Sequence, residues 1–187
     1  MTPTAYVDES EPGDRRDPGA YILAAAIPAV DAHELVRDEL RALKPRSARK
    51  LHWTESDAAY RQRIAAALAG LPLTFVAAVA ILPPTSRSER RRRVALERLL
   101  YELVAVGIDS VVLESRGPAD RHDRAHVDAL RARRMIGSVR VDHVAGTADP
   151  LLWAADAACG LISQDRREES ARRSLFDDRM VVHEVRR

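Results

Sequence analysis

The stretch AYVDES, residues 5–10, joins the start of an apolar strand to two adjacent carboxylates. Its first three residues predict a buried strand, and Asp8 and Glu9 stand where that strand should end. The next segment, EPGDRRDPG at 11–19, is dense in Pro, Gly and Asp and therefore predicts a loop. AYILAAAI at 20–27 predicts a second strand, so the chain opens with an antiparallel hairpin.

Helices and strands alternate after this hairpin. Apolar residues at helical spacing predict helices over 31–43, 57–69, 86–106 and 123–135 and a long helix starting near 149. Apolar runs predict strands over 73–82, 108–113, 138–144 and 180–185. This order predicts an α/β fold: a three-strand antiparallel meander, then alternating helices and strands in a mixed sheet. We expect one domain over residues 1–187, with a helical insertion at about 31–70 before the third strand.

The first helix of that insertion has a predicted start signal. Asp31 is a plausible N-cap, and Glu34, three residues later, would complete a capping box.

The overall charge is nearly balanced. Lys and Arg number 30 against 28 Asp and Glu, which gives a formal net charge of +2. This mild basicity is weak evidence for a polyanionic partner, and GC-rich coding also explains the preference for arginine over lysine. Aromatic residues make up only 4%, so we do not expect a base-stacking platform.

The cysteine content and the hydropathy of the sequence bear on the cellular compartment of the protein. Cys159 is the single cysteine, which excludes an internal disulfide and a cysteine-only metal cluster. The N-terminus lacks a basic region followed by an apolar one, and no apolar run approaches the ~20 residues of a membrane span. We therefore expect a cytoplasmic protein that does not enter a membrane.

An acid stands in the most apolar helix of the chain. Asp156 lies within DPLLWAADAACGLIS, residues 149–163, which is apolar nearly all round and should be buried. An ionised carboxylate there costs roughly 3 kcal/mol or more unless it is paired or binds a cation. A structural salt bridge is the alternative. Asp149 shares a helix face with Asp156, although an N-cap role explains Asp149 better.

A further acid follows the apolar run at 111–113. Glu114 ends this strand, and strand ends are where sites are built in such sheets. Together with Asp8, Glu9 and Asp156, it predicts a cluster of carboxylates from two strand ends and one buried helix. Oxygen ligands of this kind suit Mg²⁺ or Mn²⁺ rather than Zn²⁺. Two such ions held about 3.5–4 Å apart cleave phosphodiesters.

Four motifs together resemble the domain of unknown function family 3800, from residue 5 to about 164. They are YVDES at 6–10, KLHW at 50–53, VVLESR at 111–116 and DHVAGTADPLLWAADAACGLI at 142–162. The resemblance implies a ribonuclease H-like fold and metal-dependent cleavage of nucleic acid. It also implies which acids bind the metal: Asp8, Glu114 and Asp156.

The resemblance leaves one acidic position open. Ribonuclease H-like folds also take an acid from the first long helix, and Glu97 and Glu102 are both candidates. Glu9 is the other candidate for this position. The chain departs from the family in having Glu11 where Gly commonly follows Asp-Glu-Ser, which would change the hairpin turn.

Basic and imidazole side chains complete the predicted site. Lys50 and His52 belong to the family's basic-histidine motif and would point to one side of an extended segment. There they could bind the scissile phosphate or carry a proton; a surface loop with an incidental histidine is the alternative. Trp53 is better explained as a packing anchor. His143 could carry a proton or support a metal ligand, or be an ordinary core or surface histidine.

The basic run ERRRR, residues 89–93, opens the long helix at 86–106, where positive charge opposes the helix dipole. A phosphate-binding face and a solvated face paired with nearby acids explain it equally well.

These patterns predict a nuclease that uses Mg²⁺ or Mn²⁺ to hydrolyse DNA or RNA. Two alternatives stay open: a non-catalytic module that binds nucleic acid or protein on the same fold, and a hydrolase of small phosphoesters. Nucleic acid is the expected partner, and a homodimer is one option for the oligomeric state.

Overall fold

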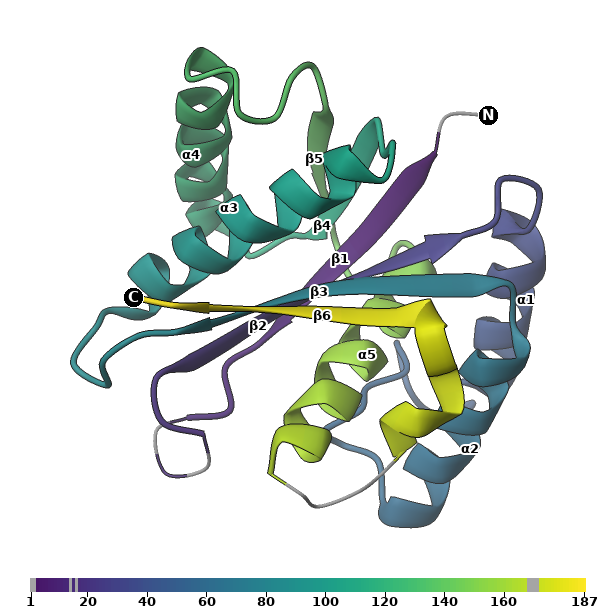
Figure 1. Ribbon diagram of the computed structural model, residues 1–187. Coiled ribbons are helices and arrows are strands. Elements are labelled where there is room, and N and C mark those ends of the chain that lie inside the picture. The colour runs from purple at the N-terminus through teal and green to yellow at the C-terminus, as the bar shows by residue number, and fades with distance from the viewer. Residues whose placement is uncertain (1–2, 14, 16, 168–171) are drawn as a thin grey trace.

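The computed structural model describes residues 3–13, 15, 17–167 and 172–187, so residues 14 and 16 of the predicted loop at 11–19 lie outside the described part. Within these residues six strands form one sheet (Figure 1). The strands are β1 (Thr4–Ser10), β2 (Ala20–Pro28), β3 (Leu73–Ile81), β4 (Ser110–Glu114), β5 (Arg140–Val144) and β6 (Met180–Arg186). All six lie within one or two residues of the ranges predicted from the sequence.

The sheet is mixed, with strand order β5-β4-β1-β2-β3-β6. The first three strands pair antiparallel, which confirms the predicted meander. β4 pairs parallel with β1, and β5 pairs parallel with β4. β6 adds a parallel strand beside β3 at the other edge. The parallel pairing brings the carboxyl ends of β1 and β4 side by side, because Val7 faces Leu113 in the register.

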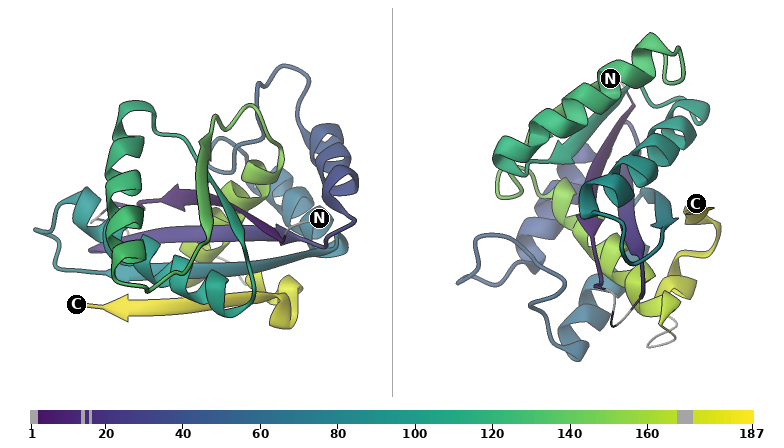
Figure 2. Two further views of the ribbon diagram at one scale, coloured as in Figure 1. Left: turned by 90° about the horizontal axis from the view of Figure 1, so that it is seen from above. Right: turned by 90° about the vertical axis from the view of Figure 1, so that its left-hand side faces the viewer.

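Helices cover both faces of the sheet (Figures 1 and 2). The helices are α1 (His33–Leu43), α2 (Ala58–Gly70), α3 (Ser88–Ala105), α4 (Asp120–Ala132) and α5 (Leu151–Arg166). α3 and α4 lie on one face, and α1, α2 and α5 lie on the other. The first two helices stand between β2 and β3, where the sequence predicted a helical insertion. Among the described residues, no helix is long and apolar enough to cross a membrane.

Each face of the sheet has its own apolar core. Tyr6 and Phe75 contribute to the core beneath α5, and Val7 and Val76 contribute to the core beneath α3. Small residues in the middle of β2, the run 24–26, are fully buried and let helices pack closely on both sides. The strand alternation that divides these residues also decides where the acids of β1 point.

The capping box predicted at Asp31 is wrong. The N-cap position is Ala32, which provides no side-chain hydrogen bond. A backbone turn starts the helix instead, because the N–H of Ala32 donates to the carbonyl oxygen of Ala29 at 2.9 Å. Glu34 pairs with Arg37 at 2.7 Å one turn further along and does not reach back to the cap.

Candidate active site

The adjacent acids of β1 point to opposite faces of the sheet. Successive side chains in a strand alternate, so Asp8 follows Tyr6 toward α5, and Glu9 follows Val7 toward α3. Asp8 is 9% exposed. Only one of the two carboxylates can therefore belong to a site on the α5 side.

Two further acids reach the α5 side. Glu114 is the last residue of β4 and shares its face with Val112, which packs against the core beneath α5. Asp156 lies on α5, is 8% exposed, and belongs to a helix that packs along β1. The thiol of Cys159 on the same helix donates to the backbone oxygen of Asp8 at 3.2 Å, which ties α5 to the end of β1.

The electrostatics of Asp8 indicate that the three carboxylates lie within range of one another. Burial, followed by repulsion from Glu114 and from Asp156, raises the pKa of Asp8 to about 8. The N–H of Glu9 donates to Asp8 Oδ1 at 2.7 Å, which opposes this effect without cancelling it. Three acids that are far apart in the sequence thus share one buried, negatively charged region.

Lys50 supplies a cation to this region. Its Nζ donates to Glu114 Oε1 at 2.8 Å. Burial acts against the ammonium form, but the bond to Glu114 and attraction to Asp8 and Asp156 raise the pKa of Lys50 overall. The ammonium therefore partly neutralises the carboxylates.

His52 lies beside Asp156. Its Nδ1 is 3.4 Å from Asp156 Oδ2, and the interaction with this carboxylate raises the pKa of His52. The next residue holds the same carboxylate in place, because the backbone N–H of Trp53 donates to Asp156 Oδ2 at 2.7 Å. Trp53 is buried, which confirms its predicted role as a packing anchor.

Two glycines that the sequence analysis did not assign shape this site. A Cβ atom on Gly160 would lie 2.0 Å from Cδ1 of Trp53, so a side chain there would push the 50–53 segment off α5. A Cβ atom on Gly146 would lie 2.3 Å from Glu114 Oε1. A glycine inside a helix is unfavourable by about 1 kcal/mol relative to alanine. A glycine within the predicted helix therefore indicates close packing at Gly160.

The donor chemistry of the site fits a hard divalent cation. Glu114 Oε2 is buried and makes no hydrogen bond within the described structure. Carboxylate oxygens are the ligands that Mg²⁺ and Mn²⁺ prefer. In the part of the chain that is described, however, no group of three or more His, Cys, Asp or Glu side chains is arranged to hold a metal ion. Ion binding would therefore require movement of the carboxylates.

Glu9 and His143 belong to a different cluster on the α3 side of the sheet. Glu9 pairs with Arg92, which is 1% exposed and also binds Asp123 at 2.8 Å. His143 Nε2 lies 3.2 Å from Asp123 Oδ2. Arg116 pairs with the same aspartate at 3.2 Å. We call these five residues the Arg92 cluster; the structure does not bring Glu9 or His143 to Asp8, because both face the opposite side of the sheet.

Asp149 and the two candidate helix acids also have other partners. Asp149 Oδ2 pairs with Arg37 at 2.8 Å, and its Oδ1 accepts from the N–H of Leu151 at 3.0 Å. The predicted N-cap role is displaced by one residue, because the N-cap position of α5 is Pro150. Glu97 pairs with Arg187 at 3.1 Å. Glu102 pairs with Arg98 at 2.6 Å. None of these acids joins the cluster formed by Asp8, Glu114 and Asp156.

Comparison with known proteins identifies the fold. No protein-family model matches the chain, and no curated protein sequence matches it, so family 3800 gains no support. Ribonuclease HII of Archaeoglobus fulgidus, in a complex with PCNA, is 15% identical with a TM-score of 0.55, over 94% of this chain and 79% of its own. Ribonuclease H2 of Pyrococcus horikoshii OT3 is 14% identical with a TM-score of 0.56, over 94% and 78%. A mutant of Bst-RNase HIII is 15% identical with a TM-score of 0.50, over 88% and 55%. The chain therefore has the predicted ribonuclease H-like fold.

Proposed function

We propose that this protein is a divalent-metal-dependent nuclease that hydrolyses phosphodiester bonds of DNA or RNA. The observation that carries the proposal is the convergence of Asp8, Glu114 and Asp156 at the carboxyl ends of two parallel strands and on the helix facing them. The ribonuclease H-like fold supports the same reaction class, since the similar structures are ribonucleases.

The three carboxylates would hold Mg²⁺ or Mn²⁺. When bound to carboxylates, such ions supply water activation and neutralise the charge that develops on a phosphodiester. Without a cation, Asp8 carries a proton more readily than an ordinary aspartate because burial and its neighbours raise its pKa. A divalent ion would offset this repulsion, which gives a physical reason for keeping three acids together.

Lys50 and His52 would act on the substrate. Release of Lys50 from Glu114 on ion binding would leave a half-buried ammonium group close to the carboxylates, where it can contact the scissile phosphate. His52 is half-buried, and its interaction with Asp156 favours the protonated ring, so it can donate a proton to a leaving oxygen.

The test is a nuclease assay on labelled single- and double-stranded DNA and RNA with Mn²⁺, Mg²⁺ or EDTA. Asp8→Asn and Asp156→Asn should abolish cleavage while each variant stays folded. Asp31→Asn, the same chemical change at an exposed acid, should cleave as the parent does. Cleavage by either site variant at the parental rate would refute the assignment of these carboxylates.

The same assay separates the alternatives. Metal-independent, salt-sensitive binding without cleavage would indicate a non-catalytic binding module. Hydrolysis of nucleotides or other small phosphoesters, with no action on polynucleotides, would indicate a hydrolase of small substrates. Nucleic acid is the proposed partner; the single-domain organisation, a cytoplasmic location and a homodimer stay predictions.

A further inference from the structure

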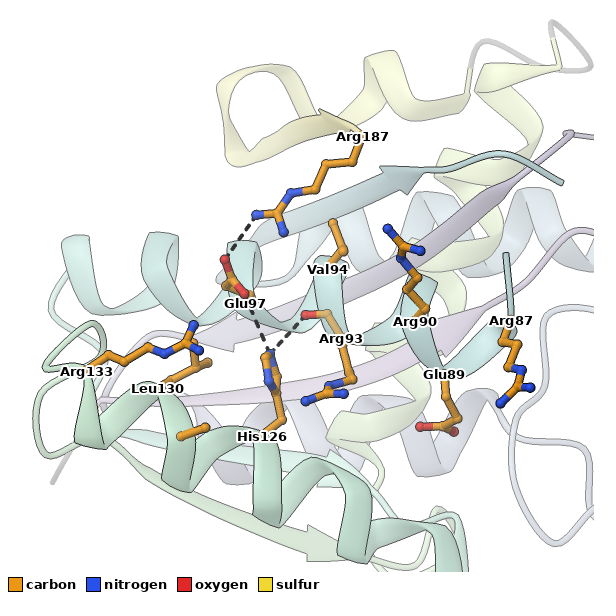
Figure 3. A pocket seen from close by; sticks show the side chains of 11 residues that line it. Arg87, Glu89, Arg90, Arg93, Val94, Glu97, His126, Leu130, Arg133 and Arg187 are labelled. Atoms are coloured by element: carbon orange, nitrogen blue, oxygen red, sulfur yellow. Dashed lines mark hydrogen bonds and ion pairs between the residues drawn. The ribbon is translucent and has the colours of Figure 1, made fainter. Parts of the chain in front are cut away.

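A pocket lies on the sheet face opposite the carboxylates. It opens between α3 and α4, close to the C-terminal residue, and has a volume of about 500 Å³ (Figure 3). The acids Asp8, Glu114 and Asp156 lie on the α5 side, so this pocket is separate from the candidate active site. Its position means that whatever binds here need not contact the carboxylates.

Arginines surround this pocket. Arg87, Arg90 and Arg93 come from the start of α3, and Arg133 follows α4. In Figure 3, Arg93 and Arg133 extend into the space between the two helices. Within the residues that the structure describes, these four exposed guanidinium groups form no ion pair. Positive charge at the first turn of a helix is unfavourable for the helix dipole, so Arg87 and Arg90 at the start of α3 lower its stability unless an anion offsets them.

The acids of the pocket do not neutralise these four arginines, because each has another partner. Glu97 pairs with Arg187 at 3.1 Å and lies 4.0 Å from His126 Nε2. Glu89 pairs with Arg116 of the Arg92 cluster at 2.5 Å. The pocket therefore keeps a surplus of positive charge.

The inner wall of the pocket includes apolar side chains. Val94 and Leu130 line it and are almost fully buried. His126 Nε2 lies 3.1 Å from the carbonyl oxygen of Arg93, which positions the ring between the helices. Burial and the nearby charge of Arg93 lower the pKa of His126, so the ring adds no charge of its own at neutral pH.

We propose that this pocket binds closely spaced phosphate groups, supplied either by a nucleotide or by a nucleic-acid strand. A guanidinium group can donate two parallel hydrogen bonds to the oxygens of one phosphate. Four such groups around one opening can therefore hold more than one phosphate. A volume of about 500 Å³ is in the range of small-molecule sites, and the apolar wall can receive a sugar or base. The inference goes beyond the proposed nuclease function and does not depend on it.

The experiment measures binding calorimetrically with the full chain in EDTA, so that no metal-dependent cleavage occurs. The two probes are a nucleoside triphosphate and a single-stranded oligonucleotide without terminal phosphates. The test variant combines Arg90→Gln, Arg93→Gln and Arg133→Gln. A matched control combines substitutions of three exposed arginines on or beside α4 that do not line the pocket, Arg121→Gln, Arg124→Gln and Arg134→Gln. Both variants lose three positive charges.

We expect the parent and the control to bind at least one probe with similar affinity, and the test variant to bind it at least about tenfold more weakly. Preference for the triphosphate identifies a nucleotide site, and preference for the oligonucleotide identifies a strand site. Equal weakening in both variants, or no binding of either probe by the parent, overturns the proposal. Because no metal is present, these outcomes are independent of whether Asp8→Asn loses nuclease activity.

Discussion

Asp8→Asn should make the metal-free protein more stable while removing its proposed activity. The ionised carboxylate of Asp8 is buried among Glu114 and Asp156, which raises its pKa from 3.8 to about 8. Asparagine keeps the size of the side chain and an oxygen that can accept the N–H of Glu9, but it carries no charge. The substitution therefore removes the free-energy cost of ionising or protonating Asp8 in this buried place and leaves the local hydrogen bond in place.

The magnitude follows from proton linkage. A carboxyl group with a raised folded-state pKa does not destabilise the protein below its unfolded pKa of 3.8, and its cost increases until the pH passes about 8. At pH 7 the gap between the unfolded-state and folded-state pKa of Asp8 lowers the free energy of unfolding by at most roughly 4 kcal/mol. Side-chain relaxation and water entry reduce this loss to about 2 kcal/mol, and its removal raises Tm by about 4–8 °C for a chain of this length.

Thermal unfolding followed by circular dichroism in EDTA tests this prediction. Asp8→Asn should melt above the parent at about pH 8, and its advantage should shrink at about pH 5. Mn²⁺ should raise the Tm of the parent and leave that of Asp8→Asn nearly unchanged. A variant that is no more stable than the parent at the higher pH, or whose advantage does not depend on pH, would refute the reasoning. Asp31→Asn, at an exposed position, is the control.

Three further substitutions probe the surroundings of the site. Lys50→Met should lower Tm in EDTA by removing the 2.8 Å pair with Glu114, with Mn²⁺ restoring most of the loss, and should slow cleavage at least about tenfold in the nuclease assay. Gly160→Ala should reduce the free energy of unfolding in urea by about 1–3 kcal/mol because its Cβ would meet a ring, whereas Gly70→Ala, with open space around it, should not. Arg92→Met should cost about 3–5 kcal/mol in the same measurement by leaving Asp123 buried without this partner, and a loss below 1 kcal/mol would contradict its structural role.

The sheet and its helices could be predicted because their signals are local. β3 is an apolar run that ends before two prolines, and β1 and β2 enclose a loop rich in Pro, Gly and Asp. Two local predictions were wrong: α4 spans Asp120–Ala132 instead of 123–135, and the N-terminal cap of α1 is not Asp31. Asp31 has the preferred residue type for a cap, but a backbone turn ending at Ala32 starts the helix one residue later.

The charged partners could not be predicted, because they come from distant parts of the chain. Arg92 lies in a run of arginines that fits a solvated or phosphate-binding face equally well. In the structure it is buried between β1 and α4, where it binds Glu9 and Asp123. Its neighbours Arg90 and Arg93 stay exposed in the pocket beside α4. The periodicity of α3 therefore buries Arg92 of this run and leaves Arg90 and Arg93 exposed.

The two acids of the opening motif are adjacent because they have different tasks. A strand turns neighbouring side chains to opposite faces, so Asp8 and Glu9 cannot ligate one ion without distorting β1. Glu9 instead pairs with Arg92 and lies 3.8 Å from Arg116, which follows β4. Those pairs link the end of β1 to α3 and to the segment after β4 on the α3 side of the sheet, whereas Asp8 and Glu114 lie on the α5 side. The Arg92 cluster thus supplies attraction between charged groups on the α3 side of β1, opposite the proposed metal ligands, which repel one another on the α5 side.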